Sequence, residues 1–68
     1  MKQFTFTLRG GASSIALMSD AWAAVVITSL RQELSVFFTD AIGRQGFIPF
    51  RAIVHVAITV VVDEERAP

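Results

Sequence analysis

The sequence contains no cysteine, so neither a disulfide nor a thiolate metal site can stabilise this small chain. Charged residues make up only 18% of it and the formal net charge is zero, which argues against a nucleic-acid binder that relies on neutralising phosphates. The longest uncharged runs contain about ten residues, whereas a membrane-spanning helix needs roughly 18–20. Alternating Phe and Thr after Lys2 do not resemble a secretory signal. We therefore expect a cytoplasmic protein without a membrane span.

Motifs for catalysis and cofactor binding are also missing from the sequence. Neither Gly10-Gly11 nor residues 43–46 match a phosphate-binding glycine pattern. His55 is the only side chain expected to titrate near neutral pH, and no second His and no Cys could join it as a metal ligand. No serine or acid has a recognisable spacing from it. We predict no catalytic residue, no metal ligand and no cofactor, and a protein that is not an enzyme.

Hydrophobic residues, in contrast, make up 53% of the 68 residues. A chain of this length has room for one domain, residues 1–68, and buries a smaller share of its surface than a larger protein does. The surplus of apolar side chains predicts an interface with another chain.

Residues 47–62 are rich in β-branched side chains and predict one long strand. The odd positions from 51 to 61 alternate between polar and apolar, so the second face is mixed. The even positions are all apolar and predict one fully buried face: Phe50, Ala52, Val54, Val56, Ile58, Val60 and Val62.

A β-hairpin is predicted at the start of the chain. Residues 3–8 alternate strictly between apolar and polar, and Gly10-Gly11 is typical of a two-residue turn. A second strand over residues 12–18 would then place Phe6 opposite Ile15. In the same register Phe4 faces Leu17 and Thr7 faces Ser14. A helix that begins near Ser13 is the alternative.

One amphipathic helix is predicted from Ala21 to about Ile42, because nine apolar residues of this segment fall within one arc of about 160°. They are Trp22, Ala23, Val26, Ile27, Leu30, Leu34, Phe37, Phe38 and Ala41. Ser19 and Asp20 favour its start, and Gly43 is suited to the position after its end. In the alternative, the helix ends near Leu34 and residues 36–42 form a strand that is joined to the last strand by a turn at residues 43–46.

These elements predict an α+β fold in ββαβ order, in which a hairpin and a long C-terminal strand pack on one helix; βαββ is the alternative. At about 3.3 Å per residue, a strand over residues 50–62 is roughly 43 Å long, whereas a seven-residue hairpin strand spans about 23 Å. We expect the excess to pair with a second copy.

We therefore predict a small protein-interaction module that acts as a homo-oligomer, a dimer or larger, through its C-terminal strand and binds another protein. The alternative is an oligomer that binds a flavin or another small anionic ligand between subunits, in a pocket lined by Trp22, Arg51 and His55. A weaker alternative is nucleic-acid binding by two arginines and two aromatic residues around one loop. The candidate interface residues are Trp22, Arg44, Phe47, Phe50, Arg51, Ile53, His55 and Thr59.

Overall fold

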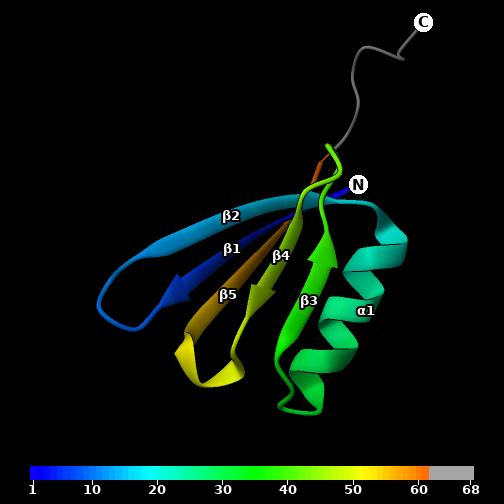
Figure 1. The fold of residues 1–68 in the computed structure, drawn as a ribbon. Helices are drawn as coiled ribbons and strands as arrows, with labels where there is room; N and C mark the ends of the chain where they lie inside the picture. Colours follow the sequence, from blue (N-terminus) through cyan, green and yellow to red (C-terminus); the bar gives the residue numbers. More distant parts are fainter. Residues whose placement is uncertain (62–68) are drawn as a thin grey trace, which may run out of the picture.

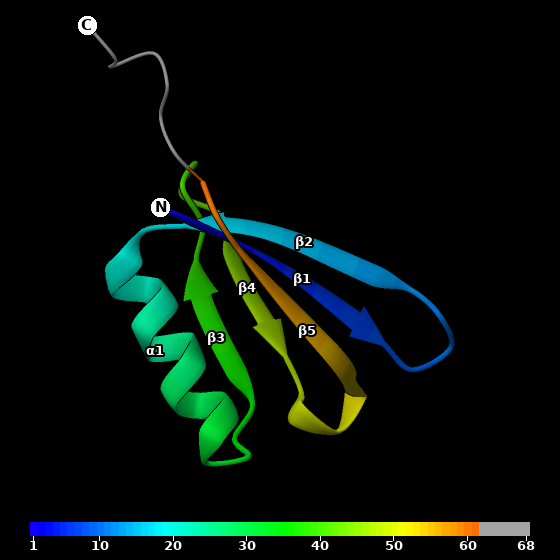
Figure 2. The same ribbon diagram turned by 180° about the vertical axis from the view of Figure 1, so that it is seen from behind.

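A computed structural model describes residues 1–61 and has the predicted α+β architecture (Figures 1 and 2). Strands β1 (Lys2–Leu8), β2 (Ser13–Met18) and β5 (Ile53–Val60) form an antiparallel sheet in the order β2-β1-β5. The central strand, β1, is thus paired on both sides, and each outer strand has one edge without a neighbouring strand among the described residues.

Helix α1 (Asp20–Arg31) and a second hairpin lie on one side of this sheet (Figure 1). The hairpin pairs β3 (Val36–Thr39) with β4 (Gln45–Ile48), and the short 3₁₀ helix η1 (Phe50–Ala52) leads from β4 into β5. The first hairpin, the helix and the last strand therefore follow one another as predicted, with β3 and β4 between the helix and β5.

The hydrophobic core lies between the sheet and the layer formed by α1 and the second hairpin. Phe4 and Phe6 of β1 are fully buried at its centre, and the ring of Phe38 stacks on Phe6 with 6.0 Å between the centroids. The other buried members come from β2, α1, β3 and β4. They are Ala16, Met18, Ala23, Val26, Val36 and Ile48.

The predicted register of the first hairpin is wrong by one residue. Phe6 pairs with Ser14, and Ile15 pairs with Thr5 instead. The loop has three residues rather than two, because the Leu8 amide donates to the Ala12 carbonyl at 2.7 Å. Gly10 and Gly11 both adopt positive φ angles of 88° and 89° in this loop. In the observed register Ala16 and Met18 of β2 are buried on the same face as Phe4 and Phe6 of β1, and Ile15 is 64% exposed.

The predicted end of the helix at Ile42 is also wrong. Its start is confirmed, since the Ser19 hydroxyl accepts a hydrogen bond from the Trp22 amide at 3.3 Å. The helix ends at Arg31, and Glu33 then takes a positive φ of 58°, a conformation that stops a helix. The alternative with a strand from Val36 was closer to the structure.

The C-terminal segment is not one long strand. Pro49 lacks an amide hydrogen and precedes η1, so the segment divides into β4, η1 and β5. Strand β5 has 8 residues and β1 has 7, so β5 has no excess length. The argument for self-association from strand length is therefore wrong. The predicted strand end at Val62 lies outside the described residues.

Candidate interaction site

The backbone of β5 has one side bonded to β1 and one side open. The Val61 amide donates to the Met1 carbonyl at 3.0 Å, which fixes which residues of β5 exchange hydrogen bonds with β1. Because bonding alternates along an antiparallel strand, His55, Ala57 and Thr59 bond to β1. The amides and carbonyls of Val56, Ile58 and Val60 point the other way. We call these outward groups the β5 edge.

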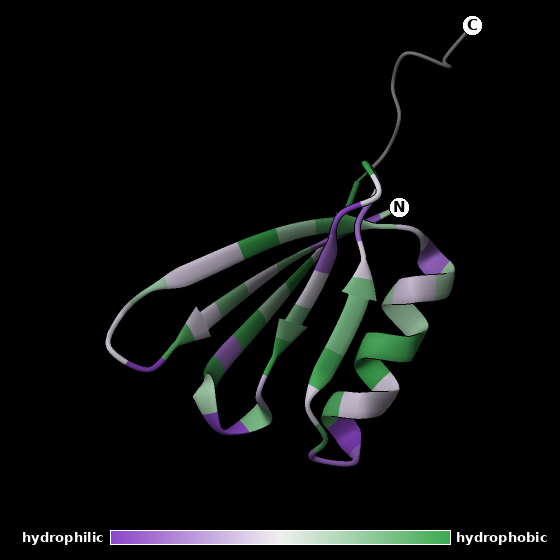
Figure 3. Cartoon of the chain, viewed as in Figure 1, coloured by the Kyte–Doolittle hydropathy of each residue, from purple (hydrophilic) through white to green (hydrophobic). Residues whose placement is uncertain are grey.

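The side chains of the β5 edge residues lie on the same face as Phe4 and Phe6, because paired residues of a ladder share a face. Val56 opposes Phe6 and is half-buried, whereas Ile58 is 44% and Val60 66% exposed. Hydrophobic colour covers most of β5 in Figure 3. The predicted fully buried face is therefore wrong. The layer formed by α1 and the second hairpin leaves the C-terminal half of β5 uncovered.

Nothing in the sequence of β5 protects its edge. Proteins blunt exposed strand edges with Lys, Pro, bulges or covering loops, which prevent pairing with another chain. Between Ile53 and Val60 there is no Pro, Gly, Asp, Glu, Lys or Arg. The register shift opposite Thr7 and Leu8 lies near the start of β5, and the ladder with β1 is regular from His55 onward.

The opposite edge of the sheet, which belongs to β2, has a backbone partner within the chain. Ser14 and Ala16 bond to β1, so the backbone groups of Ser13, Ile15 and Leu17 point outward; we call these outward groups the β2 edge. The Leu17 carbonyl accepts a hydrogen bond of 2.7 Å from the Ala41 amide. The turn between β3 and β4 thus satisfies part of the β2 edge.

Asp40 holds this turn in shape. Its Oδ1 accepts hydrogen bonds from the Arg44 amide at 2.8 Å and the Ile42 amide at 3.1 Å, and its Oδ2 accepts one from Arg44 Nε at 3.2 Å. Partial burial raises the pKa of Asp40, but the hydrogen bonds from Arg44 and Ile42 outweigh it, so the pKa lies below its ordinary 3.8. Gly43 takes a positive φ of 89° within the turn.

The candidate residues of β5 lie on two faces of the sheet. His55 and Thr59 are exposed on the face opposite the core, beside Thr7 and Gln3 of β1. Ile53 is half-buried and packs against the core. Of these three candidates on β5, only His55 and Thr59 thus lie on the same face of the sheet.

Trp22 does not lie near His55 within the chain. It is half-buried on α1, where its ring meets Phe37 edge-on with 6.1 Å between the centroids. The helix covers the core face of the sheet and His55 lies on the other face. A single chain therefore forms no pocket from Trp22, Arg51 and His55.

The four residues suggested for nucleic-acid stacking are separated along β4. Arg44 lies in the turn before β4 and binds Asp40, whereas Phe50 and Arg51 belong to η1 after its other end. Phe47 is exposed on the outer face of the second hairpin, paired with Phe37.

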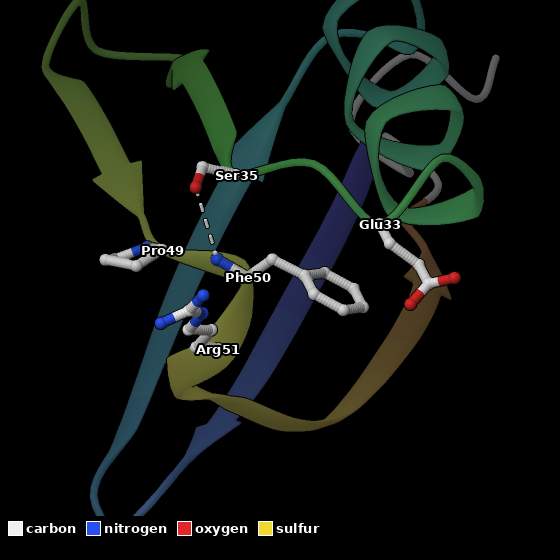
Figure 4. A pocket seen from close by; sticks show the side chains of 5 residues that line it. All are labelled: Glu33, Ser35, Pro49, Phe50 and Arg51. Atoms are coloured by element: carbon white, nitrogen blue, oxygen red, sulfur yellow. Dashed lines mark hydrogen bonds between the residues drawn. The ribbon is translucent and has the colours of Figure 1, made fainter.

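A shallow hollow of about 470 Å³ lies beside η1, lined by Glu33, Ser35, Pro49, Phe50 and Arg51 (Figure 4). The Phe50 amide donates to the Ser35 hydroxyl at 3.3 Å, and this bond ties η1 to the start of β3. The charged groups of Glu33 and Arg51 point to opposite sides in Figure 4. They do not converge on a common ligand position.

Sequence reasoning missed the three edge residues Val56, Ile58 and Val60, which it assigned to the core. The alternation of β5 identified their shared face correctly but could not reveal how much of that face the other layer covers. Phe37 was missed because it was placed on the helix. Its pairing with Phe47 could have been found only from the alternative in which residues 36–42 form a strand.

Across residues 1–61, no group of three or more His, Cys, Asp or Glu side chains could hold a metal ion. No helix in this part of the chain is long and apolar enough to cross a membrane. No family model, curated protein or solved structure matches the chain.

Proposed function

We propose that this protein is a small, non-enzymatic protein-interaction module that acts as a homo-oligomer through β5. The observation that supports the proposal is the β5 edge, where outward backbone groups and half-exposed Val and Ile side chains occur together. Adding a strand to such an edge satisfies the backbone groups and covers the apolar side chains at once.

The expected affinity is moderate. Fully burying a Val or Ile side chain stabilises by about 1.5–3 kcal/mol, and each new backbone hydrogen bond contributes about 0.5–1.5 kcal/mol net. Association costs about 4–15 kcal/mol in lost freedom of motion, so a single strand pairing leaves a modest surplus. We expect an oligomer that forms at micromolar concentration and dissociates on dilution.

Size-exclusion chromatography with light scattering tests the proposal. The wild-type chain should elute with a mass of at least twice 7.4 kDa at high concentration and approach 7.4 kDa on dilution. A folded chain that remains at 7.4 kDa across the micromolar range would overturn the proposal.

Two proline variants localise the contact. In Ile58→Pro the lost amide is one that points away from β1, so the sheet should fold while the oligomer is lost. Ile15→Pro removes the matching outward amide at the β2 edge and should leave the oligomer intact. Ile58→Lys, with a charge in place of the apolar side chain, should also be a folded monomer. An oligomer that persists in both Ile58 variants contradicts the proposed surface.

A further inference from the structure

We infer that two copies pair β5 with β5 in antiparallel orientation about a two-fold axis at Ala57, forming one continuous six-stranded sheet. This inference rests on the proposed function and adds the partner, the orientation and the register. The partner surface is a second copy of the same edge.

The direction of the backbone groups restricts the register. Across a new antiparallel ladder, hydrogen-bonded pairs can join only residues whose backbone groups point outward, namely Val56, Ile58 and Val60. A two-fold axis at Ala57 pairs Val56 with Ile58 of the second copy and Ile58 with its Val56. Val60 then lies opposite Val54, the residue at the register shift between β5 and β1. An axis at Val56 also satisfies the alternation but sets Val60 opposite Ala52, which belongs to η1. The axis at Ala57 instead sets Ile53 opposite Val61, whose amide still bonds to Met1. An axis at Ile58 sets three residues of β5 opposite positions that follow the strand.

The side chains agree with the axis at Ala57. On the core face Ile58, 44% exposed, faces the half-buried Val56 of the second copy. Val60, 66% exposed, and Val54, 64% exposed, lie opposite each other at the two ends of the pairing. On the other face, two Ala57 side chains meet at the axis, where their small size allows close approach. His55 there faces Thr59, a polar pair on an exposed surface.

Charge favours the antiparallel orientation. Strand β5 has no charged residue that a two-fold axis would bring against its own copy. In the sequence Arg51 precedes β5, and Asp63, Glu64 and Glu65 follow it. Antiparallel pairing sets the end of β5 from which the acidic residues continue beside the Arg51 end of the second copy. Parallel pairing would instead set the two Arg51 ends of β5 beside each other, which brings like charges together.

Cysteine cross-linking tests the register, because the chain has no cysteine of its own. At the axis the two Ala57 residues form a non-hydrogen-bonded pair with Cα atoms about 4.5 Å apart, within the range of about 4.4–6.8 Å for a disulfide. Ala57→Cys should therefore form a covalent dimer on mild oxidation, seen by non-reducing electrophoresis.

Thr59→Cys is the matched control. Its two copies would be four residues apart along the strands, about 13 Å, and should not cross-link. The double variant His55→Cys with Thr59→Cys should cross-link efficiently, since these residues face each other across the axis, whereas each single variant should not.

Light scattering on the reduced variants separates the two proposals. A dimer that cross-links through Ala57→Cys and the double variant supports the inference. A dimer that cross-links through Thr59→Cys instead, or through neither Ala57→Cys nor the double variant, overturns the register and leaves the proposed function standing. A folded monomer overturns both.

Discussion

The two edges of the three-stranded sheet differ in the backbone partners that the rest of the chain gives them. At the β2 edge, the turn between β3 and β4 reaches across and the Ala41 amide bonds the Leu17 carbonyl. At the β5 edge, no backbone partner is found among the described residues, although Ile58 and Val60 are apolar and exposed. The difference teaches that the turn between β3 and β4 supplies a backbone partner to β2 and none to β5, which is why we propose the β5 edge as the interaction site.

The largest expected effect is a loss of unfolding free energy that depends on whether the substituted amide of β5 faces β1 or faces away from it. Thr59→Pro removes an amide that bonds Gln3 of β1 and should cost about 3 kcal/mol or more of unfolding free energy. Ile58→Pro changes the neighbouring amide, which points away from β1, and should cost clearly less. Urea unfolding at one low protein concentration, where subunit contacts contribute little, gives the comparison. Equal losses would mean that the assigned backbone direction is wrong.

A smaller loss is expected when the hairpin that covers β2 is pushed out of place. A Cβ at Gly46 would lie 2.5 Å from Cζ of Phe38, a ring that is 5% exposed and stacked on Phe6. Gly46→Ala should therefore destabilise by about 1–3 kcal/mol through overpacking. The exposed neighbour Gln45→Ala serves as the control and should change little. A Gly46→Ala chain as stable as the wild type would contradict the packing of this hairpin.

Removing the Asp40 carboxylate should weaken mainly the turn between β3 and β4. Asp40→Ala deletes the acceptor of the Ile42 and Arg44 amides, so the Ala41 amide should exchange its hydrogen faster and the urea midpoint should fall. Asp40→Asn keeps one side-chain oxygen as an acceptor and should recover part of the loss. If Ala41 exchange is unchanged in Asp40→Ala, the turn does not depend on this side chain.

The smallest expected effect is the pH dependence of the same turn. Because the folded pKa of Asp40 lies below its ordinary 3.8, the carboxylate contributes its stabilisation fully above pH 3.8 and loses it as the pH falls through the folded pKa. The urea midpoint should therefore decrease on acidification, and less so in Asp40→Asn. The same acid dependence in both chains would assign it to other carboxylates.

The sequence was sufficient for elements with a strong local pattern. The alternation of residues 3–8 and the Ser19 cap predicted β1 and the start of α1 correctly. The register failed because Gly10-Gly11 suits both a two-residue and a three-residue loop. The helix end failed because Phe37 and Phe38 fit the apolar arc of a helix, while Val36 and Phe38 also fit one face of a strand, and four residues are too few to distinguish the two periods.

The candidate site was predictable only in part. The sequence predicted self-association through the C-terminal strand from the length of that strand. This argument is wrong, since Pro49 and η1 shorten the strand to about the length of its neighbour. Which edge is covered depends on where the turn after Thr39 lies in space. That contact joins Leu17 to Ala41, and no local pattern predicts it.

Hydrogen exchange at the β5 edge tests the central claim most directly. In concentrated wild-type protein the amides of Val56, Ile58 and Val60 should exchange slowly, and on dilution they should exchange faster while those of Ala57 and Thr59 stay protected by β1. Fast exchange at the three edge amides at every concentration would show that no second copy covers β5.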